Sequence, residues 1–215
     1  MEILKGLIEY YKINGMYVTE QFIRHFLISV YGVLLAAIIA IPLGFIIARH
    51  YKLADWIIGI ANVIQTIPSL ALLSILMLGL GLGTNTVIAT VFLYSLLPIL
   101  KNTYSGVVNV DRSLIDVGKG MGMTRWQLTK MVELPLSMSM IMAGIRNALV
   151  VAIGVTAIGT FIGAGGLGDI ISRGVNVSNG SSIIIAGALP TALMALLADL
   201  ILGYLEKKIN PLKEN

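Results

Sequence analysis

The chain of 215 residues is 57% hydrophobic and only 12% charged, and its mean hydropathy is +0.90. Soluble globular proteins carry about 25% charged residues, so this composition excludes a soluble enzyme as the leading class. The chain has no cysteine, which excludes disulfides and thiol catalysis, and two histidines are too few to suggest a metal site. We therefore expect no catalytic residues and no cofactor, and the net charge of +4 is too small to suggest a nucleic-acid partner.

Long apolar stretches predict an all-α membrane protein with five transmembrane helices. Crossing the hydrocarbon core takes about 20 apolar residues. The uncharged stretch from Trp56 to Leu100 is long enough to cross twice, and it contains a turn-forming cluster from Gly79 to Asn85. We predict one transmembrane domain over residues 1–215, with spans at 26–48, 56–79, 84–100, 137–162 and 182–205. Residues 1–25 are expected to form an interfacial segment and residues 101–136 a segment outside the bilayer.

The positive charges predict the orientation of these spans. Ten basic residues fall on one side: Arg49, Lys52, Lys101, Arg112, Lys119, Arg125, Lys130, Lys207, Lys208 and Lys213. Only Lys5, Lys12, Arg24 and Arg173 fall on the other. Because basic residues favour the cytoplasmic side, we expect a multi-pass protein of the cytoplasmic membrane with its N-terminus outside and its C-terminus and residues 101–136 inside.

The segment between the third and fourth spans predicts two short helices joined at a glycine corner. Asp111 or Ser113 can cap the first, Gly120 and Gly122 interrupt it, Thr124 can cap the second, and Leu134-Pro135 is expected to end that one. A solvated connecting loop is the plain alternative. We favour a docking surface for another protein, because the corner is rich in apolar side chains: Met121, Met123, Trp126, Leu128 and Met131.

In this segment Asp116-Val117-Gly118 is followed after three residues by Gly122, and Leu134-Pro135 closes the pattern. The pattern resembles the cytoplasmic loop of the permease subunits of binding-protein-dependent ABC importers of type I. Their loop reads Glu-Ala-Ala, then a glycine after three more residues, and closes on Leu-Pro at the same spacing, so Asp116, Val117 and Gly118 replace the first three residues. The resemblance implies that a separate ATPase receives this coupling segment, with Met123 and Arg125 in contact and Gly122 forming the corner.

Four further blocks carry a second resemblance: Val63 to Leu73, Leu97 to Gly106, Met142 to Ala148 and Ile162 to Ile171. They resemble the osmoprotectant branch of that family, and the resemblance covers roughly Arg24 to Leu212. The resemblance implies import of glycine betaine, carnitine, choline or a similar compatible solute, with a separate extracytoplasmic binding protein selecting it.

The chain offers no nucleotide site of its own, so ATP would be bound by the partner subunit. Gly163 to Gly168 satisfies G-x-G-x-x-G literally, but it follows a predicted span instead of a strand. We expect a glycine turn there, at a place where the backbone must approach neighbouring helices closely.

Polar residues inside the spans are the candidates for a pathway or a gate, because a charge at the centre of a span costs about 2.5–3.5 kcal/mol. They are Gln65, Pro68, Tyr94, Arg146, Asn147 and Asp199. Arg146 and Asp199 lie at similar depths in the last two spans, so we expect an ion pair that is structural, with a gate as the alternative. Pro68 predicts a kink in its helix. Two interpretations of this kink stay equally open: a bend without a further role, and a bend that lines the pathway.

Five helices form a thin wall, so we expect a second copy or a related permease to complete the pathway within the bilayer. Gly144, Ala148, Gly154 and Gly159 are expected to allow close packing there. Three alternatives remain: a permease for another small solute such as methionine, a passive channel or small intramembrane regulatory protein, and, last, a membrane enzyme. The passive channel would not explain the apolar cytoplasmic corner.

Overall fold

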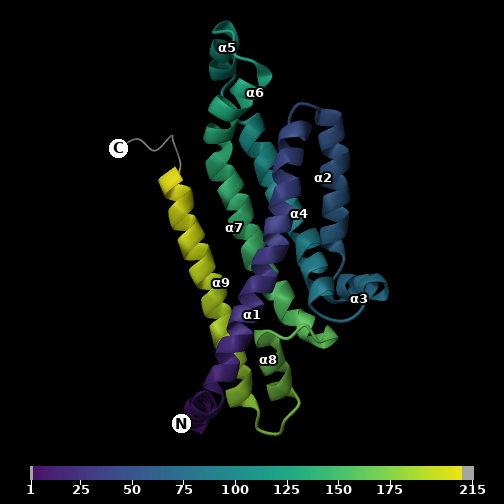
Figure 1. The fold of residues 1–215 in the computed structure, drawn as a ribbon, viewed down its shortest axis with the longest axis vertical. Coiled ribbons are helices and arrows are strands. Elements are labelled where there is room, and N and C mark those ends of the chain that lie inside the picture. The colour runs from purple at the N-terminus through teal and green to yellow at the C-terminus, as the bar shows by residue number, and fades with distance from the viewer. Residues whose placement is uncertain (1, 210–215) are drawn as a thin grey trace.

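The computed structural model describes residues 2–209, and every regular element in that range is a helix (Figure 1). The α-helices are α1 (Glu2–Ile47), α2 (Tyr51–Thr66), α3 (Ser69–Leu80), α4 (Thr84–Val108), α5 (Arg112–Gly120), α6 (Arg125–Leu128), α7 (Leu134–Ile158), α8 (Leu167–Val175) and α9 (Ser181–Ile209). A π-helical turn, η1 (Thr129–Glu133), precedes α7, and a 3₁₀ turn, η2 (Gly159–Ile162), follows it.

Four helical stretches are long and apolar enough to cross a membrane by length and composition, or five if α2 and α3 together form one span. The four are α1, α4, the continuous run from Arg125 to Ile162, and α9. They extend beyond the predicted spans, and α1 continues without a break through residue 25, where we expected the interfacial segment to end. The limits of the membrane-embedded part within each helix stay a prediction.

The predicted span 56–79 is divided into two helices, and α2 and α3 meet at an angle of 99°. Ile67 has an extended backbone and Pro68 stands before the first residue of α3. Proline lacks the N–H that would continue the helix, and it drives the preceding residue away from the helical region. The break is therefore sharper than the kink that the sequence predicts.

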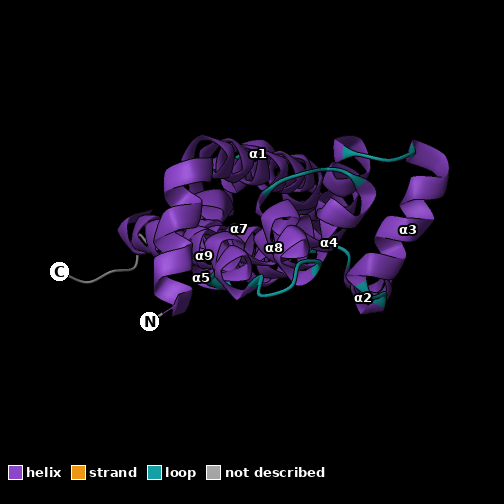
Figure 2. Ribbon diagram, turned by 90° about the horizontal axis from the view of Figure 1, so that it is seen from below, coloured by secondary structure: helices purple, strands orange, loops and turns teal. Residues whose placement is uncertain are grey.

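Helix α4 lies at the centre of the bundle and packs most extensively against α1 and α7. Seen from below, α3 extends along one edge while α9 lies toward the opposite edge (Figure 2). Gly144 meets the α4 backbone at Pro98, and Gly159 meets Val87 of the same helix. Our expectation that these two glycines serve contact with a second permease is therefore wrong, since they allow close packing within the chain. Gly154 faces open space.

The long helices alternate in direction, so that turns and short helices distant in the sequence lie at the same end of the molecule (Figure 1). The α1–α2 turn lies at the same end as α5 and α6, while the N-terminus, the α3–α4 turn and α8 lie at the other. This arrangement groups Arg49 and Lys52 with the basic residues of the segment 101–136 at one end of the molecule. The side of the membrane that this end faces stays a prediction.

The glycine turn before α8 is fastened to α1. Gly166 N donates to Gln21 Oε1 at 2.7 Å, and Leu167 N donates to His25 Nδ1 at 3.2 Å. The other ring nitrogen of the fully buried His25 lies 2.9 Å from the Ile153 carbonyl oxygen, so the neutral ring with its proton on Nε2 satisfies both contacts. A side chain at Gly168 would overlap the Ala157 carbonyl, which confirms the expected close backbone approach.

Candidate functional site

Helix α5 begins at a capped N-terminus. Asp111 is the N-cap and its Oδ1 accepts a hydrogen bond from Ser113 N at 2.8 Å. Hydrogen bonds from Ser113 favour the carboxylate form, which holds the pKa of Asp111 below its ordinary value. Asp116, the first residue of the family motif, is exposed on this helix and pairs with Lys119 at 3.3 Å.

The corner between α5 and α6 depends on two glycines with different roles. Gly118 is buried, and a side chain there would meet Leu128 Cδ1 at 2.7 Å, so the glycine lets the two short helices pack closely. Gly122 has φ of +78°, in the left-handed region that favours glycine. Its N–H donates to the Lys119 carbonyl at 2.9 Å, and the next N–H, of Met123, donates to the Gly118 carbonyl at 3.1 Å. Together these contacts end α5 and reverse the chain.

The side chains that the corner exposes differ in part from those we expected. Met123 is half-buried, with its sulfur close to Gly118. Met121 is 66% exposed and Val117, on α5, is 58% exposed, so they present more apolar surface to a partner. Arg125 is exposed at the start of α6.

The second short helix continues into α7 instead of ending at Leu134-Pro135. Thr124 caps α6 in a capping box with Gln127, as predicted for the start of this helix. Pro135 has no N–H to donate to the preceding turn, and the chain adapts through η1, in which Leu134 N–H donates five residues back to the Thr129 carbonyl. Our expectation of a helix end is therefore wrong: one helical rod connects the corner with the fourth predicted span.

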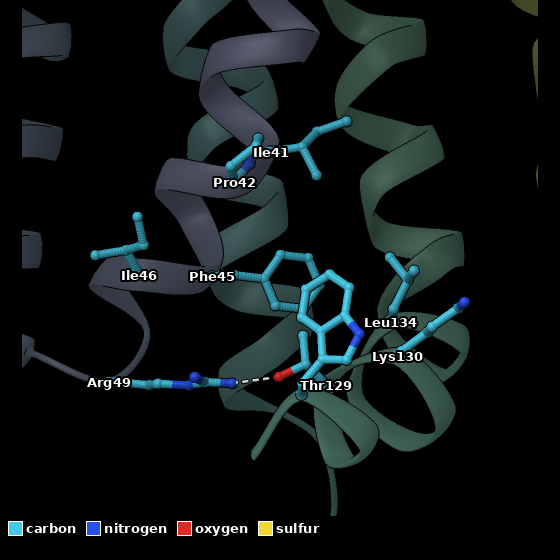
Figure 3. Close-up of a pocket in the computed structure, with 9 residues that line it drawn as sticks. Ile41, Pro42, Phe45, Ile46, Arg49, Thr129, Lys130 and Leu134 are labelled. Carbon is cyan, nitrogen blue, oxygen red and sulfur yellow. Dashed lines mark hydrogen bonds between the residues drawn. The ribbon is translucent and has the colours of Figure 1, made fainter. Parts of the chain in front are cut away.

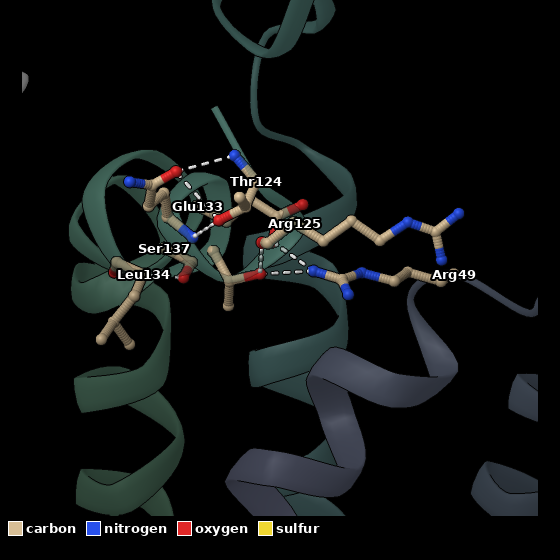
Figure 4. A network of polar contacts seen from close by, with 8 residues as sticks. Arg49, Thr124, Arg125, Glu133, Leu134 and Ser137 are labelled. Carbon is tan, nitrogen blue, oxygen red and sulfur yellow. Dashed lines mark hydrogen bonds and ion pairs between the residues drawn. The ribbon is translucent and has the colours of Figure 1, made fainter. Parts of the chain in front are cut away.

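This rod is tied to the end of α1 by a polar contact that the sequence analysis missed. The Arg49 guanidinium lies 2.8 Å from Glu133 Oε2 and donates to Thr129 Oγ1 at 2.5 Å (Figure 4). Glu133 is buried, whereas Arg49 is about two-fifths exposed. Arg49 and Glu133 are 84 residues apart in the sequence, so no local sequence pattern predicts their ion pair.

Three predicted pathway residues meet at the break between α2 and α3. Gln65 Nε2 donates to the Tyr94 carbonyl at 3.4 Å, and the Tyr94 hydroxyl donates to the Ile67 carbonyl. These contacts fasten the end of α2 to α4 beside the exposed Pro68. The tyrosine hydroxyl thereby satisfies a carbonyl at the interrupted helix end.

The predicted partners Arg146 and Asp199 lie close together, and a third charge joins them. Arg146 Nε is 3.3 Å from Asp199 Oδ1, and its Nη1 is 3.1 Å from Glu206 Oε2. Gly203 lies between the two acids in sequence, and an added Cβ there would come within 2.8 Å of Nη1, so this glycine makes room for the guanidinium. The spacing of Asp199, Gly203 and Glu206 on one helix face is the sequence signal that we missed.

The contacts of Arg146 are ion pairs without good hydrogen-bond geometry. Arg146 Nε and Glu206 Oε2 are buried and have no hydrogen-bond partner among residues 2–209. A cation facing two carboxylates leaves this group with one negative charge in excess. Asn147, the neighbouring candidate, is exposed on α7.

Comparison with known proteins supplies the context of these groups. Residues 40–211 match a family described as the inner membrane component of binding-protein-dependent transport systems. The carnitine transport permease protein OpuCD of Listeria monocytogenes is 66% identical, over 99% of this chain and 96% of the relative. The glycine betaine/carnitine/choline transport system permease protein OpuCD of Bacillus subtilis is 60% identical, over 100% of this chain and 93% of the relative.

A solved structure of the inward-facing MetNI methionine ABC transporter contains a similar fold. The TM-score is 0.80, and the match covers 89% of this chain and 95% of that chain. At 17% identity this likeness concerns the fold alone.

Proposed function

The chain belongs to the family of inner membrane components of binding-protein-dependent transport systems, and on this premise we propose that it is the permease of an ATP-driven compatible-solute importer. The membership confirms the resemblance drawn from the coupling segment, and the all-helical fold is that of a type I importer permease. It is a multi-pass membrane protein and a transport subunit, not an enzyme. Glycine betaine, carnitine, choline or a similar solute is the proposed cargo, since relatives are named for these solutes.

The observation that carries the proposal is the continuous helical rod from Arg125 to Ile162. The proposed ATPase holds the corner formed by α5, Gly122 and α6 in a surface groove. When the ATPases close on ATP, they displace the corner, and the rod transmits the displacement directly to α7. The Arg49–Glu133 contact carries part of the same displacement to α1.

The motif residues have different tasks in this proposal. Asp116 and Arg125 are exposed charges at which the ATPase contacts the corner, and Met123 supports the corner from beneath. Gly118 and Gly122 shape the corner. Leu134 and Pro135 directly follow the π-helical turn η1, at which the coupling segment passes into the span. The corner end is proposed to face the cytoplasm and the N-terminus the outside, which the grouping of basic residues supports.

The other groups belong to the proposed pathway, which a second copy or a related permease completes. Tyr94 and Gln65 hold the break at Pro68, so that α2 and α3 can change their angle without exposing an unpaired carbonyl. Arg146 holds α7 and α9 together near their cytoplasmic ends. This ion pair keeps the helices aligned, and its opening would accompany release of the solute.

Uptake of labelled glycine betaine, carnitine and choline tests the function directly. Vesicles contain the complete system with its binding protein, and the matched controls omit this chain or carry an ATPase that binds but cannot hydrolyse ATP. The proposal expects uptake of at least one solute that requires both this chain and hydrolysis. Uptake that continues without hydrolysis would identify a passive channel, and uptake of methionine alone would identify a different solute class.

A further inference from the structure

A groove lies between the end of α1 and the start of the helical rod that begins at Arg125, beside the corner between α5 and α6 (Figure 3). Its volume is about 480 Å³. The side chains that decide its chemistry are Ile41, Phe45 and Ile46 of α1, Trp126 of α6, Lys130 of η1 and Leu134 of α7. We call it the α1–η1 groove.

The walls of the groove are apolar although the groove is open to its surroundings. Ile46 is 53% exposed and Trp126 is 73% exposed. Leaving such surface in water costs about 25 cal/mol per Å², which favours an apolar occupant. The groove lies where α1 ends and the polar turn with Arg49 begins, the level at which acyl chains of a bilayer meet their headgroups.

The polar groups at the rim select for negative charge. Lys130 forms no ion pair within the described part of the chain, while the guanidinium of Arg49 is neutralised by Glu133. The rim therefore has one positive charge in excess. Tryptophan and lysine beside each other are typical of the membrane–water interface, where the indole lies among headgroups and the ammonium reaches toward phosphate.

We propose that the α1–η1 groove binds one anionic phospholipid of the cytoplasmic leaflet. An acyl chain lies along Ile41, Phe45 and Ile46, and the phosphate accepts hydrogen bonds from Lys130. Charge complementarity and apolar walls together favour this occupant over a zwitterionic lipid. The placement in the cytoplasmic leaflet rests on the orientation proposed above.

The lipid would bridge two elements that move in transport. One side of the groove belongs to α1 and the other to η1 and the rod, and the Arg49–Glu133 contact closes it on the side toward the cytoplasm. The ATPase surface proposed above includes α5, which lies farther from α1 than α6 does (Figure 1), and Arg125 of α6, while the lipid contacts α6 through Trp126. Trp126, which the sequence assigned to protein docking, is thereby assigned to the lipid.

Fluorescence of Trp126 provides the test, because Trp56 is the only other tryptophan of the chain. The full-length chain with Trp56→Phe is reconstituted into phosphatidylcholine vesicles that contain a small fraction of brominated phosphatidylglycerol or brominated phosphatidylcholine. Bromine quenches a tryptophan only when the lipid is in contact with it. A matched chain with Trp126→Phe reports the quenching of Trp56, which lies outside the groove on α2.

The proposal expects Trp126 to be quenched preferentially by the anionic lipid, and Lys130→Gln to reduce this preference by about fivefold, the typical contribution of one lysine near an anionic surface. Lys130→Arg, which retains the charge, should retain the preference. Trp56 should be quenched equally by both lipids.

Three results would overturn the proposal. Equal quenching of Trp126 by both lipids would mean ordinary contact with the bilayer. Retention of the preference in Lys130→Gln would place the anion selectivity elsewhere. No quenching by either lipid would mean that protein, such as a second copy of the chain, covers the groove. The assay measures no transport, so its outcome is independent of the importer proposal.

Discussion

Replacement of Gly122 by alanine tests whether the left-handed corner between α5 and α6 shapes the surface offered to the ATPase. The φ of Gly122 is +78°, and a Cβ added there would meet nothing within 4 Å. Any effect of alanine therefore arises from the backbone and not from a steric clash. A left-handed conformation costs an L-residue about 1–2 kcal/mol, and the lower entropy of unfolded alanine offsets about 0.4–1 kcal/mol of this.

The net destabilisation of about 1 kcal/mol lowers the population of the native corner by up to about fivefold. The apparent affinity of the ATPase should fall by the same factor, because only the native corner is competent to bind. The ATPase is titrated onto the permease in lipid nanodiscs, and the hydrolysis stimulated by the binding protein is measured on the same samples. Asparagine tolerates the left-handed region better than alanine does, so Gly122→Asn should give an intermediate loss.

Gly120 provides the matched control, since it also faces open space but lies within α5 without a positive φ. Gly120→Ala should leave binding unchanged or improve it, because alanine favours a helix by up to about 1 kcal/mol over glycine. Equal losses in the two variants would refute the reasoning, as would unchanged binding in Gly122→Ala.

Two further predictions concern the groups proposed for the pathway. Tyr94→Phe retains the ring but leaves the Ile67 carbonyl without its donor; we expect thermal unfolding in detergent to show a loss of about 1 kcal/mol, and an unchanged melting temperature would contradict this. Asp199→Asn leaves Arg146 paired with Glu206, whereas Arg146→Gln leaves the two acids facing each other. Solute uptake should therefore fall much further in Arg146→Gln than in Asp199→Asn. Equal losses of uptake would rule out the three-charge arrangement.

Much of the coupling segment could be predicted because its contacts are local. The N-cap Asp111, the capping box at Thr124 and the corner at Gly122 are each defined by residues within five positions of one another. Local rules also predict the break at Pro68, since a missing N–H acts on its own helix. They do not predict its angle of 99°, which depends on how α3 packs against α4.

The sequence by itself determined that this chain is a helical membrane protein, because composition and the length of apolar runs decide which solvent a helix can face. It also determined the family, because the coupling motif is contiguous. Only the tertiary structure decided that Arg49 contacts Glu133 and that Glu206 joins Arg146. The physical reason is that such contacts depend on the rotation and depth at which helices pack, and these are set by the whole interface, to which residues distant in sequence contribute together.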